Sequence, residues 1–243
     1  MKHQPKLVAI VGGSGAGKTW LAHRLVEKLR PAAARLSLDD FYTDQAALGP
    51  QQREQVNYDH PRAIDWPRVE TVLRSCQAGK SVRVPKYDFA THTRCSGEML
   101  PAPRVLLVDG LWLLLRPSVR ALFNFSIFLD CPAQVRLERR LSRDIAERGR
   151  SSSTVREQFF KDVAPMHERY VAPQASDADI VLHHSPHQVE VENLAETIRA
   201  LAAEDEPQRD EFHVRWPMSV NSPVILRRLK NVKLELPAFN HQN

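Results

Sequence analysis

The chain has 243 residues, of which 42% are hydrophobic, and it carries a formal net charge of +5. This size fits one large domain or one domain with an appendage, and the composition allows a buried core. The longest apolar run, residues 105–115, is interrupted by Asp109 and Gly110 and is too short to cross a membrane. The three cysteines are scattered and odd in number, which indicates reduced thiols in a cytoplasmic protein and neither a disulfide framework nor a metal site.

Apolar strands alternate with amphipathic helices through most of the chain. In order, the pattern predicts a strand over 7–11, a helix over 20–29, a strand over 34–38, a helix over 66–78, strands over 104–110 and 125–129, helices over 132–148 and 154–170, a strand over 178–182 and a helix over 189–203. Residues 43–64 are polar and irregular, and residues 79–103 contain a short strand. This alternation is typical of a three-layer α/β/α sandwich with a mainly parallel sheet.

The composition changes near Glu204, where the charged stretch EDEPQRDE begins. We therefore expect one domain over residues 1–204 and a C-terminal extension over residues 205–243. Residues 209–243 count six Arg or Lys against three Asp or Glu. The extension is expected to form strands or extended chain that packs on the domain or forms an oligomer contact. It lacks the aromatic and basic interleaving that would favour nucleic acid as a partner.

Residues 12–19, GGSGAGKT, match the phosphate-loop pattern G-x-x-x-x-G-K-[ST] between a predicted strand and a predicted helix. Gly12 and Gly17 permit backbone angles that a side chain would forbid, so successive amides can point into one concavity and bind phosphate oxygens. The helix that follows adds its free N–H groups and the positive end of its dipole. The residues predicted to bind a nucleoside triphosphate are Gly12, Gly13, Ser14, Gly15, Ala16, Gly17, Lys18 and Thr19.

Two oxygen-bearing side chains are predicted to hold Mg²⁺. The Thr19 hydroxyl belongs to the phosphate loop, and Asp109 ends the buried strand 104–110. Lys18 is expected to neutralise the β- and γ-phosphates of the nucleotide.

A carboxylate for the acceptor follows the second predicted strand. Asp39 and Asp40 lie in LSLDDFY (36–42), at the end of that strand. In an open α/β sheet the carboxyl ends of the strands face the ligand crevice, so a carboxylate there can orient an acceptor hydroxyl and take its proton. Spacing alone does not rank the two, and Asp40 is a candidate helix cap. Asp59, in NYDHPRAIDW (57–66), is a candidate for sugar hydroxyls, although turn chemistry explains such a loop equally well.

Five arginines mark the helix over 132–148 and its end: Arg136, Arg140, Arg143, Arg148 and Arg150. The first three share one face. A solvated basic face, with the acidic side chains of the same helix as partners, is the ordinary interpretation. Phosphoryl transfer, however, requires cations over the developing charge, and an arginine-rich helix that stops at Gly149 suits a closing lid.

Residues 85–94, PKYDFATHTR, concentrate two aromatic rings, an imidazole and several charges. No period of 2 or 3.6 runs through them, so the segment is expected to be an irregular loop. A mutual ion pair between Asp88 and Arg94 is expected to brace it.

Five segments together resemble the uridine kinases (uridine–cytidine kinases), within the phosphoribulokinase and uridine kinase group of P-loop kinases. They are GGSGAGKT, SLDDFY, NYDHPRAID, PKYDFATHTR and RRLSRDIAERGR, in that order, and the resemblance covers residues 5–203. The phosphate loop is shared with many NTPases, whereas YDF followed by H-x-R, together with RD-x-x-ERGR, is far more specific.

The resemblance implies transfer of the γ-phosphoryl group of ATP or GTP, with Mg²⁺, to the 5′-hydroxyl of uridine or cytidine. It implies a catalytic role for Asp39, Lys18 and Arg143, and a nucleotide-binding role for Arg148. The residues that it implies on the substrate side are Tyr42, Tyr58, Asp59, Tyr87, Phe89, His92, Arg140, Arg150 and Gln158. Among these, Asp59 and Arg140 would hold the ribose, Tyr87 and His92 would read the pyrimidine, and Phe89 and Tyr58 would flank it. The family also implies a cytoplasmic homo-oligomer.

The chain departs from the family's pattern at several positions. Asp109 stands where Glu is usual, Tyr58 where Phe is usual, and Trp20 where a small polar residue usually follows the loop. The segment HHSPH (183–187) replaces the usual residues near the nucleotide base, which leaves the choice of phosphate donor open.

Two other functions fit parts of the sequence. A sibling kinase could act on another alcohol, such as pantothenate, a sugar phosphate or nicotinamide riboside, but the aromatic and imidazole cluster favours a flat base. A nucleotide-dependent regulatory or nucleic-acid-binding protein would use the basic charge, which by itself does not distinguish a polyphosphate ligand from nucleic acid.

Overall fold

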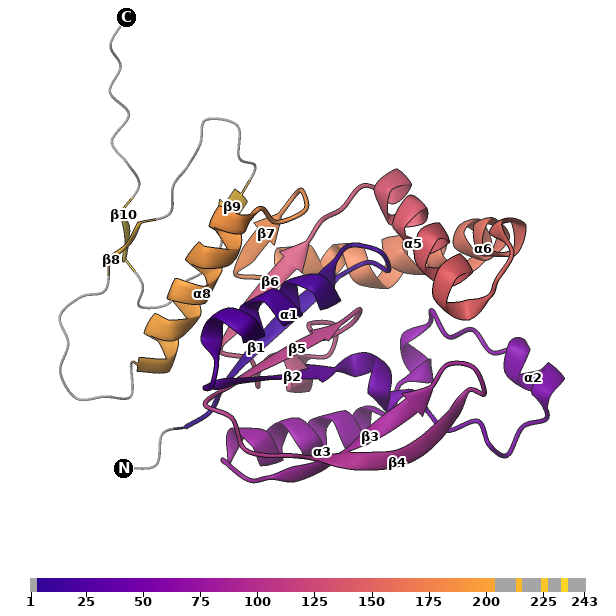
Figure 1. Ribbon diagram of the computed structural model, residues 1–243, viewed down its shortest axis with the longest axis horizontal. Coiled ribbons are helices and arrows are strands. Elements are labelled where there is room, and N and C mark those ends of the chain that lie inside the picture. Colours follow the sequence, from indigo (N-terminus) through magenta and orange to yellow (C-terminus); the bar gives the residue numbers. More distant parts are fainter. Residues whose placement is uncertain (1–3, 204–212, 216–223, 227–232, 236–243) are drawn as a thin grey trace, which may run out of the picture.

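A six-stranded sheet forms the centre of the part of the chain that the structure describes (Figure 1). The computed structural model describes residues 4–203, 213–215, 224–226 and 233–235. The strand order is β2 (Ala33–Ser37), β5 (Val105–Gly110), β1 (Lys6–Gly12), β6 (Phe125–Leu129), β7 (Ile180–Leu182) and β9 (Val224–Leu226). The first five strands pair in parallel, and β9 pairs antiparallel with β7. The predicted α/β fold with a mainly parallel sheet is confirmed.

Helices cover both faces of the sheet. On one face, α1 (Lys18–Leu29) and α8 (Gln188–Ala203) bury apolar side chains in one cluster with Ile10 of β1. On the other face, α3 (Trp66–Gln77) shares a second cluster with Ala9 of β1. Because successive side chains of a strand point to opposite faces, neighbouring residues of β1 belong to different layers of the core. Burial on both faces explains why β1 and β5 are apolar without interruption up to their ends.

Residues 85–94 belong to a β-hairpin, so the prediction of an irregular loop is wrong. β3 (Val82–Asp88) pairs antiparallel with β4 (Thr93–Leu100), and the register shifts between Val84 and Lys86. A register shift of this kind breaks the alternation of side chains that would reveal a strand. In addition, no residue of β4 is fully buried, so β4 presents no apolar face that a sequence pattern could detect.

The arginine-rich helix α5 (Ala133–Arg148) ends at Gly149, which adopts a left-handed conformation with φ of 62°. The helix expected over 154–170 is irregular. It consists of α6 (Ser152–Gln158), π-helical turns over Phe159–Val163 and His167–Val171, and α7 (Ala164–Met166) between them. Pro165 lies between the two π-helical turns and lacks an N–H donor, which accounts for the break in regular α-helical hydrogen bonding.

The shorter helical elements are α2 (Pro50–Glu54), α4 (Pro117–Arg120) and 3-10 turns over Leu38–Phe41, Pro61–Ala63 and Ala172–Ser176. Of the extension, the structure describes three strands: β8 (His213–Arg215), β9, and β10 (Lys233–Glu235), which pairs in parallel with β8. The division of the chain at residue 204 and the character of the whole extension stay predictions. None of the helices described is long and apolar enough to cross a bilayer.

Candidate active site

The phosphate loop connects β1 to α1 with three glycines at positive φ. Gly12 has a φ of 154°, Gly15 of 82° and Gly17 of 96°. A side chain at Gly15 would collide with the backbone of Arg136, so this position requires glycine for space as well as for its backbone angle. The ammonium group of Lys18 donates to the Gly13 carbonyl oxygen at 2.9 Å. Burial lowers the pKa of Lys18 to about 8, against the opposing attraction of Asp39 and Asp109.

The two side chains predicted to hold Mg²⁺ lie together. The Thr19 hydroxyl donates to Oδ2 of Asp109 at 2.9 Å. Hard oxygen donors of this kind suit Mg²⁺, which keeps several waters and needs only one or two protein ligands in addition to phosphate. A third side chain also lies here, because Arg35 of β2 donates to both carboxylate oxygens of Asp109, at 2.7 and 3.1 Å.

The structure distinguishes the two carboxylates after β2. Burial raises the pKa of Asp39, while Lys18 and Arg143 lower it and Asp109 raises it further. Asp39 therefore lies within the field of the phosphate-loop lysine and the metal-site carboxylate. Asp40 instead pairs with Lys86, at 3.3 Å. It is not a helix cap, because Ser37 accepts the hydrogen bond from the Asp39 amide at the start of the 3-10 turn.

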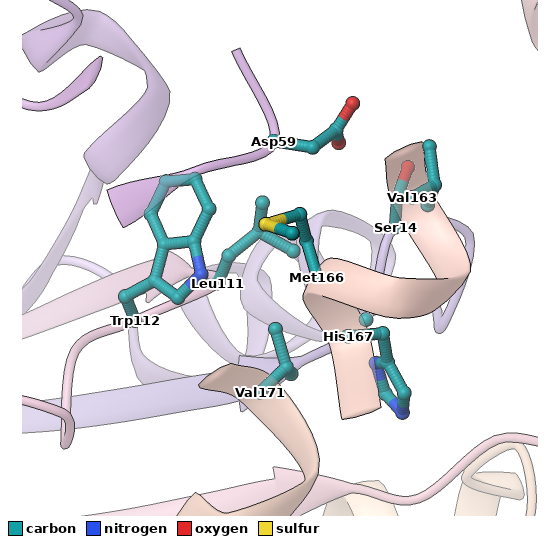
Figure 2. A pocket seen from close by; sticks show the side chains of 9 residues that line it. Ser14, Asp59, Leu111, Trp112, Val163, Met166, His167 and Val171 are labelled. Atoms are coloured by element: carbon teal, nitrogen blue, oxygen red, sulfur yellow. The ribbon is translucent and has the colours of Figure 1, made fainter. Parts of the chain in front are cut away.

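Asp59 lies at the edge of a pocket behind the phosphate loop (Figure 2). Burial raises the pKa of Asp59, and Arg140 and Arg150 oppose this shift. Two buried polar atoms, Nε1 of Trp112 and Nδ1 of His167, have no hydrogen-bond partner among the residues described. The remaining lining residues are Gly13, Ser14, Leu111, Val163, Met166 and Val171. Burial also lowers the pKa of His167 to about 4, so its imidazole is neutral near pH 7 and can accept or donate a hydrogen bond.

Five arginines were expected on α5 and at its end, and four of them surround one buried carboxylate. Asp144, which is fully buried, accepts hydrogen bonds from Arg143 Nε at 2.9 Å and pairs with Arg143 NH2 at 2.8 Å. Arg140, Arg148 and Arg150 have nitrogen atoms within 3.5–3.6 Å of the same carboxylate. The interpretation as a solvated face is wrong for Arg136 and Arg140, which are only 2% and 5% exposed.

Gln158 of α6 is bonded to two arginines of this cluster. Its side-chain oxygen accepts hydrogen bonds from Arg140 and Arg150, each at 3.0 Å. Arg140 also donates to the Ser14 hydroxyl of the phosphate loop at 3.0 Å. The helix α5, which carries Arg140, is therefore joined to the phosphate loop and to α6 through one guanidinium group.

The aromatic residues predicted to bind the base form one cluster. The rings of Tyr42, Tyr87 and Phe89 lie 5.2–6.0 Å apart between centroids, in tilted or edge-on contacts. Tyr58 stacks on His92 at 4.1 Å with nearly parallel planes. Phe89 and Tyr58 were predicted to flank the base from opposite sides, and in this structure the face of Tyr58 is covered by His92.

Two charged side chains of the hairpin have other partners than expected. Asp88 accepts hydrogen bonds from the Ala90 amide and the Thr91 hydroxyl and so stabilises the turn. Arg94 pairs with Asp65 at 2.9 Å. The expected ion pair between Asp88 and Arg94 is therefore wrong, because Asp88 and Arg94 are not opposite each other in the ladder, where Tyr87 faces Arg94.

Comparison with known proteins agrees with this arrangement. Residues 7–191 match the model of the phosphoribulokinase / uridine kinase family. The chain belongs to this family. A uridine kinase from Halobacterium salinarum is 33% identical over 198 residues, which are 81% of this chain and 88% of that protein. A uridine kinase from Halalkalibacterium halodurans is 34% identical over 207 residues, 84% of this chain and 98% of that protein.

The fold is also that of solved kinases. Phosphoribulokinase from Rhodobacter spheroides superposes with a TM-score of 0.56 at 15% identity, covering 74% of this chain and 70% of that one. At this identity the likeness concerns the fold alone. Family membership identifies the chain as an ATP-dependent P-loop kinase.

Sequence reasoning missed two side chains in this kinase. Asp144 is one of the acidic side chains of the helix that the sequence suggested only as partners on a solvated face, although it lies fully buried among arginines. A charged residue inside the strand AARLS was the one sign in the sequence that Arg35 has a specific role. Its partner could not be predicted, because Asp109 is 74 residues away in the sequence.

The segment HHSPH lies beside the phosphate loop of the kinase. Arg139 of α5 donates to the carbonyl oxygen of Gly15 at 3.4 Å and also contacts the hydroxyl of Ser185. His184 pairs with Glu190 at 3.2 Å, and its ring stacks on that of His187. These contacts fix residues 183–187 against the start of α8.

Proposed function

We propose that this kinase transfers the γ-phosphoryl group of ATP to the 5′-hydroxyl of uridine or cytidine and forms the nucleoside monophosphate. The observation that carries the proposal is the cluster of Tyr42, Tyr87 and Phe89, whose ring centroids lie 5.2–6.0 Å apart. Asp39, a half-buried carboxylate that precedes this cluster in the chain, interacts electrostatically with both Tyr42 and the phosphate-loop lysine. The relatives at 33–34% identity that bear the name uridine kinase support this substrate class.

The donor side consists of the phosphate loop and the arginine cluster. Loop amides and Lys18 bind the triphosphate, and Arg143 and Arg148 supply positive charge where the transferred group becomes more anionic. Thr19 and Asp109 would hold Mg²⁺, which neutralises charge on the β- and γ-phosphates when it is bound. The charges of Lys18 and Arg143 both act on Asp39, which supports a common point for donor and acceptor.

On the acceptor side, Asp39 orients the nucleoside hydroxyl and takes its proton. The hydroxyl oxygen forms a bond to the γ-phosphorus while the bond from that phosphorus to the bridging oxygen of ADP breaks. Burial raises the pKa of Asp39, which makes the carboxylate a stronger base than an exposed aspartate. Asp59, on which the charge of Arg140 acts, would accept hydrogen bonds from the ribose hydroxyls.

The base is held by the hairpin. Phe89 offers an aromatic face, and Tyr87 and His92 offer polar atoms near its edge, with 3.5 Å between the Tyr87 hydroxyl and Nδ1 of His92. Burial and the nearby arginines Arg150 and Arg148 lower the pKa of His92, so the imidazole is neutral near pH 7 and can accept a hydrogen bond. A neutral polar edge suits a pyrimidine better than an anionic sugar phosphate.

The proposal is tested with the purified protein, ATP and Mg²⁺, and with uridine, cytidine, adenosine, pantothenate and nicotinamide riboside as separate acceptors. UMP or CMP should form, and the other acceptors should react at least about a hundredfold more slowly by kcat/KM, because buried polar groups left unpaired discriminate strongly. Phosphorylation of pantothenate or nicotinamide riboside in preference to both pyrimidine nucleosides would refute it.

The role of Asp39 has its own test. Asp39→Asn should lower kcat about a hundredfold or more and leave ADP affinity within about threefold. Asp40→Asn is the matched neighbour, and its loss of kcat should be much smaller. Equal losses in the two variants would contradict the assignment.

We also propose that the kinase is a cytoplasmic homo-oligomer. Light scattering after gel filtration would measure the molar mass and so give the number of subunits.

A further inference from the structure

Arg35 of β2 makes a two-pronged contact with the metal-site carboxylate. Its Nε donates to Oδ1 of Asp109 at 2.7 Å, and its NH2 donates to Oδ2 at 3.1 Å. The Asp109 side chain is 4% exposed and that of Arg35 is 25% exposed. Paired donation of this type is directional and roughly twice as strong as neutral hydrogen bonds. The contact is therefore a defined structural feature and not a mobile surface ion pair.

In the register of the sheet, Arg35 and Asp109 are not opposite each other. β2 and β5 pair so that Arg35 lies opposite Leu107, and Ser37 lies opposite Asp109. The side chain of Arg35 must extend along the sheet by two residues toward the phosphate loop. Its place is also costly, because a cation near the N-terminal end of α1 is repelled by the helix dipole unless an anion compensates it. Nothing in the proposed phosphoryl transfer requires a guanidinium group here.

The contact uses most of what Asp109 can offer. A carboxylate has about four lone-pair positions. The Thr19 hydroxyl occupies one on Oδ2, and Arg35 occupies one on each oxygen. One position, on Oδ1, stays open, and a divalent cation that takes it lies beside the guanidinium group of Arg35 and is repelled by its charge.

We propose that Arg35 is an internal competitor of the divalent metal for Asp109. It neutralises the buried carboxylate when metal and nucleotide are absent, and it gives up at least one of its two hydrogen bonds when they bind. It thereby raises the metal concentration that the kinase requires. This inference rests on the proposed function, in which Thr19 and Asp109 hold the metal of the nucleotide.

Two measurements test it on the full-length protein. The first is the dissociation constant of Mn²⁺ in the presence of saturating ADP, from the electron paramagnetic resonance signal of free Mn²⁺. In Arg35→Leu it should fall about tenfold, because a monovalent and a divalent cation on one carboxylate repel by at least this amount even at the dielectric constant of water. Arg35→Lys keeps the charge but loses the two-pronged geometry, so its dissociation constant for Mn²⁺ should lie between those of Arg35→Leu and the wild type.

The second measurement is the melting temperature with and without Mg²⁺ and ADP. Arg35→Leu leaves the buried Asp109 without its cation and with only the Thr19 hydrogen bond, so without ligands the variant should melt roughly 5 °C below the wild type. With saturating Mg²⁺ and ADP the difference should shrink or reverse, since the metal replaces the missing cation. The control is Arg74→Leu, which removes an exposed pair with Glu70 on α3 and should change neither quantity.

The outcomes are distinguishable. Equal Mn²⁺ constants in the wild type and Arg35→Leu would overturn the competition and leave the proposed function intact. A loss of metal-free ADP affinity in Arg35→Leu, with no gain in Mn²⁺ affinity, would make Arg35 a phosphate ligand and would also overturn it. If neither protein binds Mn²⁺ with ADP, the metal site of the proposed function fails, and the inference fails with it.

Discussion

Asp144 offers the sharpest test of how the arginine cluster is held. Asp144→Asn keeps the shape of the side chain and removes its charge, so the guanidinium groups of Arg140, Arg143, Arg148 and Arg150 lose their common anion. The two short contacts with Arg143, at 2.8 and 2.9 Å, are charge-assisted and contribute about 1.5–3 kcal/mol each when shielded from water. Arg143 is 35% exposed, so solvent screening reduces this contribution, and the contacts near 3.6 Å add little.

The expected loss is therefore about 3 kcal/mol of unfolding free energy, which for a chain of this size lowers the melting temperature by about 6–12 °C. Asp177→Asn is the control, because Asp177 pairs with Arg120 at the surface and is 41% exposed. Differential scanning fluorimetry of both variants at low and high salt measures the effect. A melting temperature of Asp144→Asn within about 2 °C of the control would refute the view that one carboxylate anchors the lid.

Two further predictions follow from the site. Asp59→Asn should raise the KM for the nucleoside by about tenfold or more, because Asp59 is proposed to bind the acceptor. The KM for ATP should stay within about twofold. Steady-state kinetics with each substrate varied in turn measure the two constants. The affinity for ADP should decline above pH 8, by at most about tenfold per pH unit, because Lys18 with a pKa of about 8 loses the proton that phosphate binding requires. Isothermal titration calorimetry from pH 7 to 9.5 measures the ADP affinity, with Lys18→Met as the control. If the ADP affinity of Lys18→Met declines with pH as steeply as that of the wild type, another group is responsible for the decline.

The parts of the fold that the sequence predicted are those with a local signature. β1, the phosphate loop and α1 follow one another within 24 residues, and each has its own pattern of glycines or apolar spacing. β5 and β6 are buried on both faces, so their apolar runs are unbroken. The segments that resembled uridine kinases also carried residues that interact in the structure, since the charges of Asp39 and Asp59 both act on Tyr42, whose ring contacts the hairpin aromatics.

The parts that escaped prediction depend on contacts between distant residues. The hairpin of β3 and β4 was hidden because the irregularity at Pro85 interrupts the side-chain alternation and β4 buries no face. Asp40 could not be separated from Asp39 without knowing that Lys86 lies beside it, 46 residues further along the chain. In the same way, the burial of Arg136 follows from packing against Phe159, whose ring lies 5.8 Å from the guanidinium carbon.

The stacked rings of Tyr58 and His92 have a thermodynamic consequence for substrate choice. His92 has a left-handed backbone conformation, with φ of 55°, and its ring stacks on Tyr58. A base that came to lie against Tyr58 would exchange one aromatic stack for another, and its gain from stacking would be only the difference between the two. Discrimination among bases would then depend on the hydrogen bonds at the rim of the ring, where one missing donor or acceptor leaves a buried polar atom unsatisfied.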